Sequence, residues 1–133
     1  MAQGPPLVMV VDDDAAVRDA LQFVLRLEGV DVRTHADGPA LLANLDLPGA
    51  VCLILKENLP VMGGCEVLRH VRARNLSPWT ILLTGAVTPA LRMRAEEAGV
   101  WLILEKPIMD NRLVDAVLGV LRKGEPPELR KTH

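Results

Sequence analysis

The sequence predicts an α/β protein: a doubly wound, five-stranded parallel sheet covered by helices on both faces, which makes a three-layer sandwich. Short apolar runs alternate with amphipathic segments from Leu7 to Arg122, as is typical of consecutive βα units. Half of the residues are apolar but only 2% are aromatic, so Val, Leu, Ile and Ala must build the core, which favours helices packed on a sheet. The length of 133 residues fits one such domain.

Five short runs are the expected strands. They are LVMVV (7–11), VDVRTH (30–35), VCLIL (51–55), TILLT (80–84) and WLIL (101–104). Four of the five are almost wholly apolar, as strands covered on both faces should be. The run at 30–35 alternates apolar and polar residues instead, so we expect it at an edge of the sheet.

Helical spacing is clearest after the first and the last strand. In the first helix the apolar residues are Val17, Ala20, Leu21, Val24 and Leu25. Asp14 is placed to cap its start and Gly29 to end it. In the last helix they are Val114, Val117, Leu118 and Leu121, and Gly124 should stop it. Weaker patterns predict helices near residues 38–45, 65–74 and 89–98, the last of them ending at Gly99.

The two ends of the chain differ from the rest. Residues 1–6 and 124–133 are rich in Pro, Gly or charge and carry no periodicity. We therefore expect a mobile N-terminus, a domain over residues 7–123 and a tail that could begin a linker. The first apolar run has no basic residues before it and stops at aspartates, which predicts neither a signal peptide nor a membrane span. A cytoplasmic location is expected.

Charge and cysteine content exclude several functions. A net charge of -2 and a pI of about 5.9 provide no basic field for holding nucleic acid or an anionic membrane. Cys52 and Cys65 lie in or beside apolar segments without CxxC spacing, so we expect two buried thiols rather than a disulfide framework or a zinc site.

Polar side chains collect where the predicted strands end. They are Asp12 and Asp13 after the first strand, Lys56 after the third, Thr84 at the end of the fourth and Lys106 shortly after the fifth. In doubly wound sheets, ligands bind beyond the carboxyl ends of the strands. These residues are therefore the candidate site.

Four motifs, in this order, carry a resemblance to a known family: the acidic pair in VVDDD, the LPVMGG turn, the Thr in LLTGA and the Lys-Pro in LEKP. The chain resembles the receiver domain of two-component response regulators, the CheY-like family. In its short local sequence motifs it resembles the FixJ-like members of that family. The resemblance implies strand order 2-1-3-4-5, the flavodoxin and CheY-like arrangement. It also implies a regulatory interaction module in bacterial phosphorelay signal transduction and not an enzyme.

The resemblance assigns roles to the polar positions. In typical members the acidic pair holds Mg²⁺, an aspartate four residues before the turn proline accepts a phosphoryl group from a histidine kinase, and a Thr and a Lys bind that group. Asp12 and Asp13 match the acidic pair. Thr84 matches the switch hydroxyl and Lys106 the phosphate-binding lysine, whose bond to the following proline is usually cis. Asn58 matches the residue whose backbone carbonyl would ligate the metal.

Two positions depart from the family pattern. Four residues before Pro60 stands Lys56, so the phosphoacceptor position is degenerate, because an amine cannot form the acyl phosphate. Three residues before Lys106 stands Ile103, where the family has a Tyr or Phe that swings inward on activation. We therefore expect phosphorylation in the family manner to fail, Mg²⁺ binding to be weak or absent, and no cofactor to be needed.

Lys56 has several interpretations. Our hypothesis is that its ammonium lies among Asp12 and Asp13 and takes the electrostatic place of Mg²⁺, because an internal cation relieves the repulsion between two carboxylates. It could instead be a surface lysine whose head faces water. Glu57 could serve as a substitute phosphoacceptor, although adjacent residues near a strand end point to opposite sides. An enzyme with Lys56 as nucleophile is a remote alternative, because neighbouring aspartates raise the pKa of a lysine.

A partner surface is expected away from this site. In the family, the fourth helix, the fifth strand and the last helix dock partners, and Arg92, Arg94 and Trp101 fall in this region. We expect a homodimer or another signalling protein there. The Arg-rich helix face could also be simply solvated, and the Trp101 ring simply packed.

Overall fold

The computed structural model describes residues 4–108 and 111–123, and these form a parallel sheet in the order β2-β1-β3-β4-β5. The strands are β1 (Leu7–Val11), β2 (Asp31–His35), β3 (Ala50–Lys56), β4 (Trp79–Thr84) and β5 (Leu102–Glu105). The predicted fold class and strand order are confirmed, and β2 is an edge strand as its alternating pattern predicted. Each predicted strand is right to within one residue at either end.

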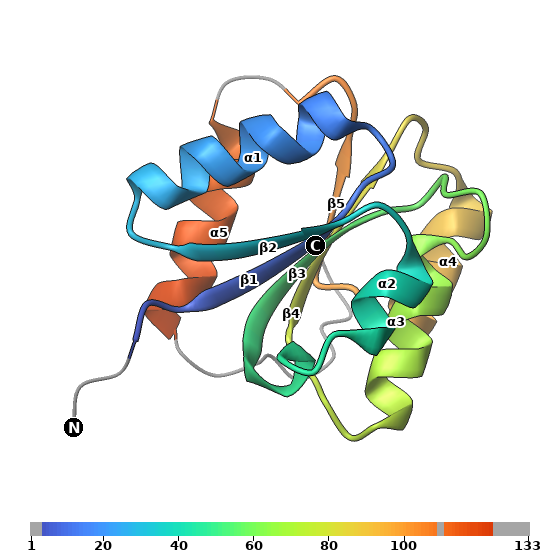
Figure 1. The fold of residues 1–133 in the computed structure, drawn as a ribbon. Coiled ribbons are helices and arrows are strands. Elements are labelled where there is room, and N and C mark those ends of the chain that lie inside the picture. The colour runs from blue at the N-terminus through green and yellow to red at the C-terminus, as the bar shows by residue number, and fades with distance from the viewer. Residues whose placement is uncertain (1–3, 109–110, 124–133) are drawn as a thin grey trace.

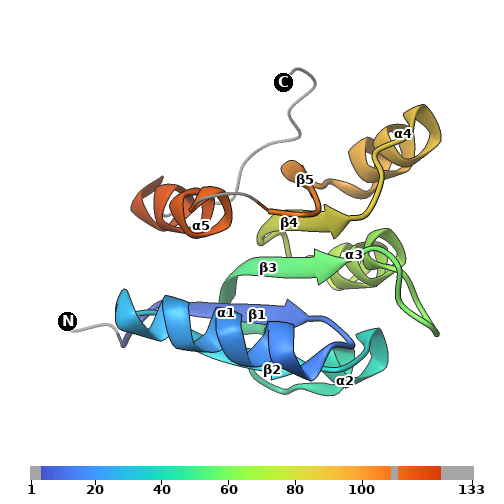
Figure 2. The same ribbon diagram turned by 90° about the horizontal axis from the view of Figure 1, so that it is seen from above.

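Helices cover both faces of the sheet (Figure 1, Figure 2). One face carries α1 (Ala15–Leu27) and α5 (Arg112–Lys123), and the other carries α2 (Gly38–Ala43), α3 (Gly64–Ala73) and α4 (Pro89–Ala98). The expected stop at Gly124 lies outside the described residues, as do residues 1–3 and 124–133 of the expected mobile ends. No helix in the described part of the chain is long and apolar enough to cross a bilayer.

Local caps explain several of the helix bounds. Asp14 accepts a hydrogen bond from the Ala16 N–H at the start of α1, and α4 ends at Gly99 in the left-handed conformation with φ +98°. The helix predicted near 38–45 ends earlier, at Ala43. Asn44 leaves the helix there, because its side-chain NH2 group contacts His35 Nε2 and its side-chain Oδ1 accepts from the Asp46 N–H. A 3-10 turn at Leu47–Gly49, which no pattern predicted, follows.

Alternation along the strands sorts the core into two halves. In β3, Cys52 and Ile54 pack on the α1/α5 side, whereas Leu53 and Leu55 pack on the α2–α4 side. Lys56 ends the strand on the first of these faces. Cys52 is free and buried, as is the second cysteine of the chain, so the expectation of two buried thiols is confirmed. Burial raises the pKa of the Cys52 thiol to about 12.

Candidate functional site

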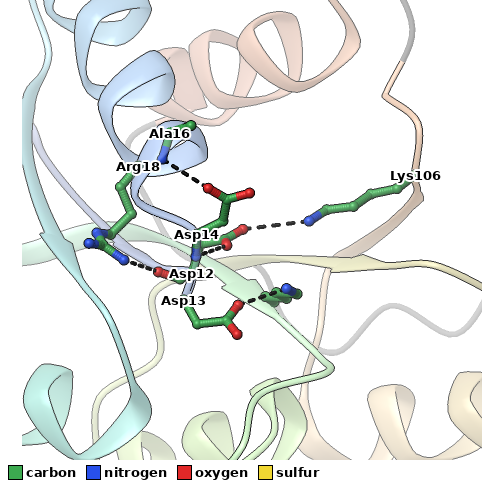
Figure 3. Close-up of polar contacts among 7 residues, drawn as sticks. Asp12, Asp13, Asp14, Ala16, Arg18 and Lys106 are labelled. Atoms are coloured by element: carbon green, nitrogen blue, oxygen red, sulfur yellow. Dashed lines mark hydrogen bonds and ion pairs between the residues drawn. The ribbon is translucent and has the colours of Figure 1, made fainter.

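The carboxyl ends of β1, β3 and β5 bring four charged side chains together. Asp12 and Asp13 follow β1, Lys56 is the last residue of β3, and Lys106 follows β5. They form two ion pairs. Asp12 Oδ2 lies 3.5 Å from Lys106 Nζ, and Asp13 Oδ1 lies 2.7 Å from Lys56 Nζ. Figure 3 shows Lys106 reaching across to Asp12, while the Asp13 carboxylate turns away from it.

Asp12 is the buried member of the acidic pair, with 1% of its surface exposed. Its Oδ1 accepts from the Asp14 N–H at 2.9 Å, and its backbone carbonyl accepts from Arg18 at 2.8 Å (Figure 3). Its Oδ2 has no hydrogen bond among the described residues, and the 3.5 Å to Lys106 is long for a charge-assisted bond. Hydrogen bonds that involve the main chain thus hold Asp12 in place, and the Lys106 ammonium compensates its negative charge.

The pair of Asp13 and Lys56 is short but more exposed. The exposed fractions of the two side chains are 41% and 23%. The hydrogen bond from Lys56 lowers the pKa of the Asp13 carboxyl, and the same bond raises the pKa of the Lys56 amine. The ammonium therefore lies on Asp13, and Asp12 acts on it only through space. Because its pKa is raised, the amine stays protonated and is a poor nucleophile.

These residues do not fit the magnesium ion that the family implies. The unbonded Oδ2 of Asp12 is a suitable ligand, but Oδ1 of Asp13 accepts a hydrogen bond from the Lys56 ammonium. The third carboxylate of the family pattern is replaced by a cation, and Mg²⁺ needs several oxygen ligands in octahedral array. Within residues 4–108 and 111–123, no three His, Cys, Asp or Glu side chains are grouped so that they could hold a metal.

Glu57 points to the other face of the sheet. Its Oε1 accepts from the Cys65 N–H in the first turn of α3 at 2.9 Å, and its Oε2 lies 3.5 Å from Arg94 of α4. The carboxylate thus satisfies a free N–H at a helix N-terminus. A Cβ at Gly63 would lie 2.8 Å from the Glu57 carbonyl oxygen, so glycine leaves the room that this contact needs. Sequence reasoning missed this cap, although the Gly63-Gly64 step at the start of α3 was a local signal for it.

The remaining family positions lie around this centre. Thr84 is 3% exposed. Its hydroxyl donates to the Ala86 carbonyl at 3.1 Å and accepts from the Ala86 N–H at 3.3 Å, so both hydrogen bonds stay within the loop that follows β4. Ile103 is partly buried on the α2–α4 side of the sheet. Asn58 lies in the exposed loop after β3. The peptide bond between Lys106 and its following proline is cis.

The expected partner surface contains residues that already have intramolecular contacts. Arg94 pairs with Glu57, although 49% of its side chain is exposed. The Trp101 ring packs edge to face on Trp79, with ring centroids 5.2 Å apart. Arg92 is exposed on α4.

Comparison with known proteins agrees with this geometry. The model of the response regulator receiver domain family matches residues 8–118. The chain is 37% identical over 120 residues to the C4-dicarboxylate transport transcriptional regulatory protein DctR of Rhodobacter capsulatus, covering 89% of this chain and 61% of that protein. It is 35% identical over 120 residues to the transcriptional regulatory protein FixJ of Bradyrhizobium diazoefficiens, covering 90% of this chain and 58% of that protein.

Solved structures give the same result. The chemotaxis protein CheY4 of Vibrio cholerae superposes with a TM-score of 0.81 at 27% identity, covering 88% of this chain and 99% of that one. The chain spans about three fifths of the length of the two regulators above. The match of the family model, the FixJ and CheY relatives and the strand order lead to one conclusion: the chain belongs to the response regulator receiver domain family.

Proposed function

We propose that this chain is an atypical receiver domain of a two-component system, with an output that is independent of phosphorylation at the usual acceptor position. The observation that carries this proposal is the Lys56 ammonium at that position, 2.7 Å from Asp13. An amine offers no carboxylate for an acyl phosphate, and its charge satisfies an acid that the metal would need. Without the acyl phosphate, the domain stays in one conformation or responds to another input.

The domain acts through protein–protein contacts in the cytoplasm and not as an enzyme. The raised pKa of Lys56 supports this, because a protonated amine does not attack a substrate. The partner is a second copy or another signalling protein at the surface of α4, β5 and α5, where Arg92 is exposed. If the partner is a second copy, Arg92→Glu should convert a dimer into a monomer in size-exclusion chromatography with light scattering.

Magnesium titration and phosphoryl labelling test the proposal. In isothermal titration calorimetry the native chain should not bind Mg²⁺ at sub-millimolar affinity, and acetyl phosphate should not label it. Lys56→Asp should gain both properties, because it restores the third carboxylate and removes the competing cation. Lys56→Gln is the matched control: it removes the ammonium, adds no carboxylate and should stay unlabelled. Sub-millimolar Mg²⁺ binding by the native chain would refute the proposal.

The alternative, a receiver that is phosphorylated on Glu57, gives a different result in the same experiment. The native chain would then be labelled, and mass mapping would locate the phosphoryl group on Glu57. The geometry weighs against it, because Glu57 is 14% exposed and both of its oxygens are engaged by the Cys65 N–H and Arg94.

A further inference from the structure

A hollow of about 660 Å³ opens at the carboxyl end of the sheet, between α1 and α5. Its walls are apolar side chains of the two helices, namely Val17, Ala20, Leu21, Val24, Leu113 and Val114. Leu83 of β4 and, after β5, Pro107 and Ile108 also line it. This volume lies within the range of about 300–1,000 Å³ that small-molecule sites occupy. The receiver chemistry described above does not use these helix side chains.

One end of the hollow is charged. Among the described residues that line it, Lys106 is the only charged one and Asn111 is the only other one with a polar side chain. The Lys106 side chain is 31% exposed, and its ion pair with Asp12 spans 3.5 Å. An ammonium has three donors, so this long contact leaves donors for a second oxygen anion. Lys106 lines the hollow, whereas its acidic partner Asp12 is not among the lining residues.

We infer that this hollow binds a small apolar carboxylate, of the class of medium-chain fatty acids. The carboxylate pairs with the Lys106 ammonium, and the hydrocarbon chain lies along the apolar side chains of α1 and α5. A monoanion suits a single lysine, whereas a phosphate dianion would find only one cation among the lining residues that the structure describes. Binding of the carboxylate does not depend on Lys56. That this binding serves as an input signal to the domain rests on the proposed function.

Octanoate is the probe. Titration into the native chain, followed by calorimetry and by the amide resonances of α1, should show saturable binding with shifts at Ala20 and Val24. Octylamine and octanol have the same hydrocarbon chain without the negative charge. They should bind more weakly than octanoate by on the order of tenfold, as expected for the loss of a charge-assisted hydrogen bond.

Two variants separate the apolar wall from the charged end. Ala20 is exposed on α1, so Ala20→Phe places a ring inside the hollow without touching the core and should strongly weaken octanoate binding. Asp19→Phe is the control, because it adds the same ring at the neighbouring exposed position, which does not line the hollow. Lys106→Gln should remove the preference for octanoate over octanol. If Lys106→Gln fails to fold, Ala20→Phe still decides the question.

Several outcomes would overturn the inference. They are the absence of saturable binding at millimolar octanoate, equal affinity for octanoate and octylamine, and unchanged affinity in Ala20→Phe. A native dimer that Ala20→Phe converts to a monomer, with no octanoate binding, would assign the hollow to a second copy and also overturn it. A chain that acetyl phosphate labels but that still binds octanoate would refute the proposed function and leave this inference intact.

Discussion

The two Asp–Lys pairs of the site are chemically alike but differ in burial. The Asp13–Lys56 contact is short at 2.7 Å, and 41% of its acid is exposed; the Asp12–Lys106 contact is long at 3.5 Å, and 1% of its acid is exposed. Water and salt screen an exposed pair, whereas a buried carboxylate depends on the protein for its partners. The distance between the charged atoms therefore does not predict which pair contributes more to stability. The long pair should matter more for stability, and the short pair more for excluding metal.

The largest expected effect is that of Asp12→Ala. This change removes the acceptor of the Asp14 N–H and the partner of Lys106 in a buried position. Hydrogen bonds to charged groups contribute about 1.5–3 kcal/mol, and we expect the free energy of unfolding to fall by about that amount. Urea denaturation measures it, with Asp13→Ala as the matched control. Equal losses in the two variants would contradict the ranking of the pairs.

Glu57→Ala should have an intermediate effect, because this carboxylate is 14% exposed and caps α3 from the opposite face of β3. Loss of a helix cap costs about 1 kcal/mol, and urea denaturation should show a loss of that size. Arg94→Ala is the control: it removes the 3.5 Å ion pair but keeps the cap, so it should change stability less. A larger loss in Arg94→Ala would mean that the ion pair, and not the cap, holds Glu57.

His35, the last residue of β2, should dominate the pH dependence of stability near neutrality. His35 Nδ1 donates to the Val10 carbonyl at 3.2 Å and its Nε2 accepts from Asn44 at 3.0 Å, so the ring is held neutral. Burial lowers the pKa of His35 below its usual 6.5. The unfolded chain therefore binds more protons as the pH falls through this range. The contribution of His35 is complete above the unfolded pKa and is lost as the pH falls toward the folded pKa.

His35→Gln should flatten the loss of stability between about pH 7 and pH 5, measured by urea denaturation at each pH. His70→Gln is the matched control, because His70 is exposed on α3. An unchanged slope in His35→Gln would show that another group carries the pH dependence.

The parts of this site that sequence predicts are those with a local signal. Apolar runs fixed the strands to within a residue, Asp14 and Gly99 were recognisable caps, and the count from Pro60 located Lys56 at the acceptor position. The missing parts are contacts between distant segments. Glu57 meets Arg94 of α4, and Asn44 leaves its helix to contact His35. No local pattern encodes such contacts, because they depend on how helices pack on the finished sheet.

The division of the four charged side chains into two ion pairs could not be predicted from the sequence either. Sequence reasoning placed Lys56 between Asp12 and Asp13. In the structure Lys106 pairs with Asp12, and Lys56 pairs with Asp13, from which 43 positions separate it in the sequence. Burial then decides what each pair contributes. Asp12 directly follows β1, an apolar strand with a neighbour on each side, whereas Asp13 lies one residue further into the loop.

The smallest expected effect on stability is that of Lys56→Met, because both members of its pair are solvated. The lowered pKa of Asp13 and the raised pKa of Lys56 keep the pair charged between these values. Its contribution is therefore constant near neutral pH. It is lost as the pH falls through the folded pKa of Asp13, below 3.8, or rises through that of Lys56, above 10.5.

Urea denaturation of the native chain and of Lys56→Met at low and high salt measures this contribution. The difference should be small at low salt and should shrink as the screening length falls to about 8 Å near physiological salt and below that at higher salt. If Lys56→Met instead lost more stability than Asp12→Ala at both salt concentrations, the ranking of the pairs would be reversed. Lys56 would then be a counterion of the buried acid itself, and the metal-like role of its ammonium would extend to Asp12.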